Sequence, residues 1–211
     1  MLGTHDLLLF IGSGLLLNVT PGPDTLYIVG RSTTQGLRAG VVAALGIGSG
    51  TLVHISAAAF GLSAILAASA GAFTAIKLIG AAYLVYVGLS LAFSSSPIDE
   101  IRATPLAPAS LGTVFLQGFM TNVLNPKVAL FFLAFLPQFV ESDAANKALA
   151  FLFLGLAFNV NGTLWNLFVA WSAARVSAGL RQRTAALKWF NRCVGGIFVA
   201  LGIRLALARE D

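Results

Sequence analysis

Charged residues are scarce in this chain of 211 residues: Asp, Glu, Lys and Arg together make up 10% of it. A soluble domain carries about a quarter charged residues, so the composition excludes an ordinary soluble globular protein and a disordered tail. Hydrophobic residues make up 57% of the chain, and the mean hydropathy is +0.87. Most of the chain is therefore expected to lie in lipid.

Cysteine is almost absent as well. The single Cys193 cannot form an intramolecular disulfide and has no metal-ligand spacing around it, so we expect no disulfide scaffold, metal site or cofactor. Lys and Arg outnumber Asp and Glu by 13 to 8, but they are scattered between apolar runs, and we expect no nucleic-acid partner. The first six residues lack a basic segment, and the apolar run that follows shows no cleavage site, so we interpret it as a retained membrane segment.

Apolar runs between the charges predict six transmembrane helices, because about 20 apolar residues cross a bilayer core. The predicted spans are residues 7–30, 39–67, 73–93, 111–139, 148–173 and 189–208. Residues 94–110 are rich in serine and proline and read as a polar linker. We therefore expect a single membrane domain, 1–211, made of repeat one (1–93), the linker (94–110) and repeat two (111–211).

The basic residues predict the orientation, since cytoplasmic loops carry the excess of Lys and Arg. Eight basic residues fall on one side of a six-span chain: Arg31, Arg38, Arg102, Arg175, Arg181, Arg183, Lys188 and Arg192. Four fall on the other side: Lys77, Lys147, Arg204 and Arg209. This places Arg31 and Arg38 in the loop after the first span and both termini outside, on the periplasmic face.

Two predicted spans are interrupted by proline at corresponding places. The first is broken at Thr-Pro-Gly-Pro-Asp, residues 20–24, and the fourth at Asn-Pro-Lys, residues 125–127. The residues before the breaks also match, 18–21 with 122–126, and so do residues 81–92 of the third span with 195–206 of the sixth. Two halves of three spans each must enter the membrane from opposite sides, so the sequence predicts an inverted repeat.

Broken helices at equivalent positions of two such halves point to the binding site of a transporter. Proline removes a backbone donor and leaves polar main-chain groups that lipid cannot satisfy, although a simple proline kink has the same cause. The candidate substrate-binding residues are Thr20, Pro21, Gly22, Pro23, Asp24, Asn122, Asn125, Pro126, Lys127 and Asn159. We expect no catalytic residue and no metal ligand among them.

Asp24 and Lys127 follow the two breaks directly and have opposite charges. A charge at the centre of a membrane helix costs about 2.5 to 3.5 kcal/mol, so each needs a partner or a function. One interpretation is a buried ion pair that ties the halves together; the other is a site for a zwitterion, and the two are compatible if substrate breaks the pair. Asp24 and His54 are candidate proton-coupling groups, although a lone histidine in a membrane helix more often only packs. Asn159 and Asn166 share a face of the fifth span, where they line a cavity or bond to another helix.

The order and spacing of these motifs resemble the LysE/RhtB family of bacterial amino-acid exporters. The similar stretches are residues 20–24, 122–127, 136–139, 77–88 and 195–205, which together extend over nearly the whole chain. The resemblance implies a carrier of the bacterial inner membrane that exports amino acids such as lysine, arginine, threonine or homoserine, driven by proton antiport. Because Asp24 is the one acidic residue inside a predicted span, a neutral substrate of the threonine or homoserine kind is favoured over lysine or arginine.

Other classes of function remain open on the residues alone. A channel or a passive membrane scaffold is one alternative, although opposite charges beside paired breaks favour a carrier. An intramembrane enzyme is less favoured, because the chain has no carboxylate pair, zinc motif, P-loop or nucleophile elbow. The expected partners are a small amino acid, the proton and the lipid bilayer, with a homo-oligomer possible.

Overall fold

Helices make up the regular structure of the described part of the chain. The computed structural model describes residues 2–64, 70–93, 106–141, 143–175 and 184–207. Beside the helices, these residues contain one isolated β-bridge, between Thr4 and Val140, which ties the N-terminal segment to the end of η3 (Leu136–Phe139). The prediction of an all-α fold is confirmed for these residues.

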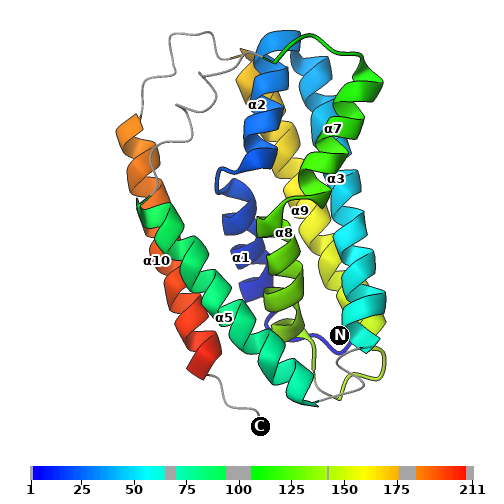
Figure 1. Cartoon of the computed structure of the whole chain (residues 1–211), viewed down its shortest axis with the longest axis vertical. Helices are drawn as coiled ribbons and strands as arrows, with labels where there is room; N and C mark the ends of the chain where they lie inside the picture. Colours follow the sequence, from blue (N-terminus) through cyan, green and yellow to red (C-terminus); the bar gives the residue numbers. More distant parts are fainter. Residues whose placement is uncertain (1, 65–69, 94–105, 142, 176–183, 208–211) are drawn as a thin grey trace.

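The helices run alternately between the two ends of the molecule (Figure 1). In the first half, α1 and α2 run together in one direction, α3 with η1 returns, and α5 runs back; their bounds are Leu7–Val19, Pro23–Gln35, Leu37–Ser56, Ala57–Leu62 and Ala70–Phe93. The second half repeats the pattern in the opposite direction, with α7 (Leu111–Val123), α8 (Pro126–Leu130), η2 (Phe131–Phe135), η3, α9 (Lys147–Arg175) and α10 (Thr184–Leu207). The start of α1 and the end of α10 lie at the same end (Figure 1).

Two of these helices are long and apolar enough to cross a membrane. They are the continuous helix Leu37–Leu62, with a mean hydropathy of 1.6, and α9, with 1.5. The pair Leu111–Val123 and Pro126–Phe139 qualifies as a third span if its bend of 45° is accepted within one crossing. Six spans therefore remain a prediction.

The helix after the first break extends beyond its predicted end. The first span was predicted to end at residue 30, but α2 continues to Gln35 and ends at Gly36, whose φ of 83° favours glycine. Arg31 lies inside this helix and is 3% exposed, so its predicted place in a loop is wrong. Its guanidinium is held by polar groups of α2, α7 and the segment before α7, which lets the helix extend past a charge.

Helices of the two halves of the chain pack against one another. α3 packs against α7, α9 packs against α1 and α2, and α3 and α9 pack on each other. α5 and α10 form a pair, in which a Cβ at Gly88 would lie 2.5 Å from the carbonyl oxygen of Gly195 and one at Gly202 would lie 2.8 Å from that of Ala81. Residues 88 and 81 correspond to 202 and 195 in the predicted repeat, so these two close approaches are equivalent.

A cluster of aromatic side chains fills the core between α1, η2, η3 and α9. Phe10, Phe131, Phe135, Phe139 and Phe158 are all buried. Their rings pack in successive pairs whose centroids are between 4.6 and 6.1 Å apart. Such pairs stabilise a core beyond the area that they bury.

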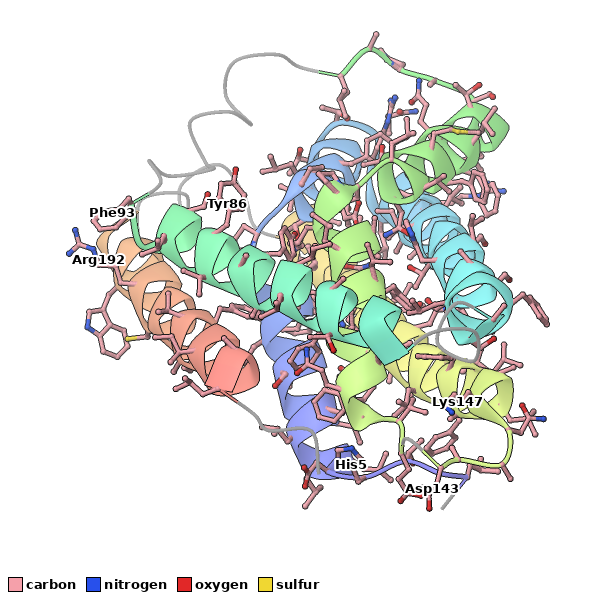
Figure 2. All side chains as sticks on the ribbon, turned by 60° about the horizontal axis from the view of Figure 1, so that its bottom comes forward. His5, Tyr86, Phe93, Asp143, Lys147 and Arg192 are labelled. Atoms are coloured by element: carbon pink, nitrogen blue, oxygen red, sulfur yellow. The ribbon has the colours of Figure 1, made fainter. Side chains whose placement is uncertain are left out.

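The labelled side chains of His5, Asp143 and Lys147 lie near helix ends, whereas Arg192 lies inside α10, as Figure 2 shows. His5, Asp143 and Lys147 gather where α1 and α9 begin, and Arg192 lies beside Phe93, where α5 ends. The flanks between carry exposed apolar side chains, Leu8, Phe60, Leu164 and Leu207 among them. This distribution is typical of a protein that lipid surrounds.

Candidate functional site

The two helix breaks are built from the same local elements. α1 ends at Val19, and α2 begins at Pro23 with Asp24 in its first turn. α7 ends at Val123, and α8 begins at Pro126, capped by Asn125, whose Oδ1 accepts the backbone N–H of Lys127 at 3.0 Å. Proline is tolerated at the first position of a helix because its missing N–H would be unpaired there anyway. The prediction that the first and fourth helices are interrupted at proline is confirmed.

A small polar cavity lies between the broken helices and helices α3 and α9. Its volume is about 20 Å³, which holds about one water molecule. Its wall consists of Asn18, Asp24, Ile47, Gly48, Thr51, Asn122, Val128, Phe158, Asn159, Gly162, Thr163 and Asn166. A site of this polarity in the middle of an apolar bundle calls for a polar occupant.

Asp24 and Asn18, which both line this cavity, each have one buried polar atom without a hydrogen-bond partner. Oδ2 of Asp24 accepts a hydrogen bond from Nδ2 of Asn122 at 2.8 Å, whereas its Oδ1 is buried without a partner. Nδ2 of Asn18 is also buried without a partner. Buried polar atoms in proteins are nearly always hydrogen-bonded, so these two atoms are candidates to bond a polar ligand.

The asparagines before the two breaks occupy equivalent places. Asn18 lies over a glycine of α9, where a Cβ at Gly162 would be 3.0 Å from its Oδ1. Asn122 lies over a glycine of α3, where a Cβ at Gly50 would be 2.9 Å from its own Cβ. Each half of the chain therefore places one asparagine at the cavity, packed against a glycine of the neighbouring helix.

The ammonium group of Lys127 is held by the end of α1. Nζ donates hydrogen bonds to the carbonyl oxygens of Leu17 at 3.1 Å and Thr20 at 3.0 Å, both of which lack an intrahelical partner at a helix C-terminus. A cation is also stabilised there by the helix dipole. Gly22 makes room, since a Cβ at this position would lie 3.2 Å from Nζ. Lys127 and Asp24 do not form an ion pair, so the direct pairing considered from the sequence is absent.

The sequence of this chain matches the model of a known protein family. The family model described as LysE type translocator matches residues 15–209, which include both breaks and the whole cavity wall. The chain belongs to this family. Its membership confirms the resemblance found in the sequence.

The names of related proteins also indicate a membrane protein and, in one case, a transporter. An uncharacterized membrane protein of Pseudomonas aeruginosa is 29% identical over 98% of this chain and 97% of its own length. The uncharacterized membrane protein YrhP of Bacillus subtilis is 30% identical over 97% of this chain and 100% of its own length. The leucine efflux protein of Salmonella typhimurium is 24% identical over 93% and 92%. No solved structure matches. The family and these names indicate a transporter and not an enzyme.

The translocator brings only part of the predicted site residues to the cavity. Asp24, Asn122 and Asn159 line it, and Asn166 does so too. The other seven predicted residues form or flank the two helix breaks and do not line the cavity: Thr20, Pro21, Gly22, Pro23, Asn125, Pro126 and Lys127. Two main-chain carbonyls at the first break, those of Leu17 and Thr20, accept hydrogen bonds from Lys127.

His54 stands next to the cavity without lining it. Its Nε2 lies 3.0 Å from the carbonyl oxygen of Asn122, and its ring stacks on Phe132 with centroids 5.9 Å apart. It contacts the residue that holds Asp24, which keeps it a candidate for proton coupling.

Three polar residues of the wall were missed in the sequence. The sequence marks Asn18 only as part of the repeated motif before the break. It does not mark Thr51 or Thr163 as site residues. Helical spacing carries a signal for two of them, because Thr163 is four residues after Asn159 and Thr51 three after Gly48, so that each pair shares a face. Nothing in the sequence states which face of α3 meets α9.

Proposed function

We propose that this chain is a secondary transporter that exports neutral amino acids, bound in the cavity between its two broken helices. The observation that carries the proposal is that Asp24 and Asn18, two residues that line a polar cavity, have the unpartnered buried atoms Oδ1 and Nδ2. A carboxylate oxygen suits the ammonium of an amino acid, and an amide N–H suits its carboxylate. A translocator family and a relative named leucine efflux protein support this choice of substrate class.

The composition of the cavity wall favours a neutral side chain. Asp24 is the one charged residue among those that line it, and the substrate ammonium takes that charge. A lysine or arginine side chain would need a second acid. Ile47, Val128 and Phe158 offer an apolar surface for an aliphatic side chain, while Thr51 and Thr163 offer hydroxyl groups for a threonine-like or homoserine-like one.

The cavity is smaller than an amino acid, which fits a carrier whose broken helices are closed on the site. A volume of about 20 Å³ accepts about one water molecule. Substrate therefore enters only when the broken helices move apart, as alternating access requires. A channel would need a continuous path instead.

The membrane arrangement that we propose has six spans in two inverted repeats. The alternating helix directions, the shared end of α1 and α10, and the equivalent glycine contacts of α5 and α10 support it. The protein then lies in the bacterial inner membrane with both termini on the periplasmic side, and linker 94–110 faces the cytoplasm.

Proton antiport is the proposed driving mechanism, with Asp24 as the carrier and His54 as its neighbour through Asn122. A carboxylate that binds either a proton or the substrate ammonium exchanges one for the other. His54→Gln retains a hydrogen-bonding group toward the carbonyl of Asn122 but cannot take up a proton. We expect this variant to keep leucine exchange and to change the pH dependence of net transport.

Transport by purified protein in liposomes tests the proposal. Labelled L-leucine, L-threonine and L-lysine are the probes, with a pH gradient or with counter-substrate. We expect leucine or threonine to move further than lysine, and Asp24→Asn to abolish their transport while the protein stays folded, since asparagine still accepts the bond from Asn122. Unchanged transport in Asp24→Asn refutes the site, and uptake that follows the substrate gradient alone indicates a channel.

A further inference from the structure

Arg31 is a buried cation whose hydrogen-bond partners are all neutral groups. Its side chain is 3% exposed. It donates hydrogen bonds to Tyr27 Oη at 3.3 Å, to Gln35 Oε1 at 2.6 Å, to the carbonyl oxygen of Ala107 at 2.8 Å and to Gln117 Oε1 at 2.7 Å. Among the described residues, no carboxylate lies within ion-pair distance of the guanidinium.

A buried guanidinium without an anion is unfavourable. Removing a charge from water costs several kcal/mol, and neutral amide oxygens return only part of it. A carboxylate binds arginine through two parallel hydrogen bonds that are roughly twice as strong as those to neutral acceptors. The site is therefore complementary to a carboxylate that the described part of the chain does not supply.

Arg31 also stands on a polar row that begins at the cavity. The row runs along the interface of α2 and α7: Asn122 bonds to Asp24 at the cavity, and Gln117 bonds to both Tyr27, at 3.1 Å, and Arg31. Asp24 and Arg31 are seven residues apart on α2, so they share a face and are about 10 Å apart along the helix axis. The row leads from the cavity toward the end of the molecule where α2 ends and α7 begins (Figure 1).

We propose that Arg31 is a second binding site, for the carboxylate of the amino acid as it passes between the cavity and this end of the molecule. The proposal rests on the proposed function, since it concerns the route of the same substrate. The side chains of Gln35 and Gln117 move away, and the carboxylate takes their place on the guanidinium. Only two bonds separate the amine nitrogen from the carboxyl carbon of an α-amino acid, so one molecule is too short to contact Asp24 and Arg31 at the same time. The two side chains therefore bind the substrate one after the other.

Gln117→Glu is the decisive variant. It places a permanent carboxylate beside the guanidinium of Arg31, at the position of an oxygen that already bonds to it, so the added charge has a partner and the fold tolerates it. If Arg31 must receive the substrate, this internal anion competes with it, and leucine transport in liposomes falls about ten-fold or more. If Arg31 only holds helices together, the variant strengthens that contact, and transport stays at the wild-type rate. The latter result overturns the proposal.

Two further variants make the test specific. Asn146→Asp is the matched control: it also turns an exposed amide whose oxygen accepts a hydrogen bond, here from the backbone N–H of Leu149, into a carboxylate, and we expect wild-type transport. Arg31→Lys keeps the charge but not the paired donors, and we expect an intermediate rate with leucine binding at equilibrium within a few-fold of wild type. Equal losses in Gln117→Glu and Asn146→Asp overturn the proposal, because an added charge alone then explains them.

Asp99 and Glu100 belong to the linker and lie outside the described residues, so the double variant Asp99→Asn, Glu100→Gln is included. We expect it to transport leucine at the wild-type rate. A loss that Gln117→Glu restores would identify a linker acid as the permanent partner of Arg31 and overturn the proposal.

The two claims fail in different ways. Leucine binding that survives in Asp24→Asn, with transport lost in Gln117→Glu, refutes the cavity and supports the Arg31 site. Leucine binding lost in Asp24→Asn, with normal transport in Gln117→Glu, supports the cavity and refutes the Arg31 site.

Discussion

Replacing Lys127 by methionine tests whether this residue supports the fold or binds substrate. Its ammonium satisfies two carbonyl oxygens, of Leu17 and Thr20, at the end of α1. An acceptor left unsatisfied in a buried place costs about 1–3 kcal/mol, so the loss of both costs about 2–6 kcal/mol. Removing the buried charge returns part of that, because the ammonium no longer has to be desolvated. We expect a net loss of about 2 kcal/mol in the free energy of unfolding.

The assay is thermal or denaturant unfolding of the purified protein in detergent, together with leucine binding to the folded fraction. We expect Lys127→Met to lower the stability clearly and to change the leucine affinity of the folded protein little. Arg38→Met is the control, since it removes a basic charge from an exposed position in the first turn of α3. An unchanged stability in Lys127→Met, with leucine binding lost, would refute the structural role and restore Lys127 to the substrate site.

Glycine positions give two further predictions. Gly46→Ala places a Cβ on the carbonyl oxygen of Phe115, and we expect a loss of about 1–3 kcal/mol in unfolding free energy, whereas Gly61→Ala, with nothing within 4 Å, should cost nothing; thermal unfolding of both compares them. Gly48→Ala places a Cβ 2.8 Å from Thr163 Oγ1 inside the cavity, and we expect weaker leucine binding at little cost in stability. Normal stability in the first variant or wild-type affinity in the last would contradict the packing described here.

The breaks could be predicted because proline and charge leave a local signature. Pro23 and Pro126 each start a helix, and the predicted fourth span, 111–139, matches the observed run of α7 to η3 at both ends. A sequence states that a helix must stop at such residues, since the backbone there lacks a donor. It also states that Asp24 needs a partner.

The partners themselves could not be predicted, because they come from elements distant in the chain. Lys127 bonds to carbonyl oxygens of α1, which have no side-chain signature. Asp24 bonds to Asn122, 98 residues away. The two opposite charges therefore do not pair directly. The carbonyl oxygens at the end of α1 bind Lys127, and the side-chain amide of Asn122 binds Asp24.

Arg31 shows a second limit. A charge at the predicted end of a membrane span is normally an interfacial residue, and the length rule places it in a loop. In the structure α2 continues past it, because Gln35, Gln117 and the backbone carbonyl of Ala107, in the segment before α7, supply acceptors. Such a set of neutral partners is spread over three elements and has no pattern in the sequence.

The most direct test of the central claim is the protection of a cysteine placed in the cavity. Thr163→Cys in a Cys193→Ser background puts a thiol on the cavity wall, where a water-soluble thiol reagent reaches it only when the helices open. We predict slow labelling in membrane vesicles that a transported amino acid such as L-leucine slows further, in proportion to its occupancy. A protein that transports leucine while the thiol stays unlabelled, or is labelled at a rate that leucine does not change, would contradict the assignment of this cavity as the substrate site.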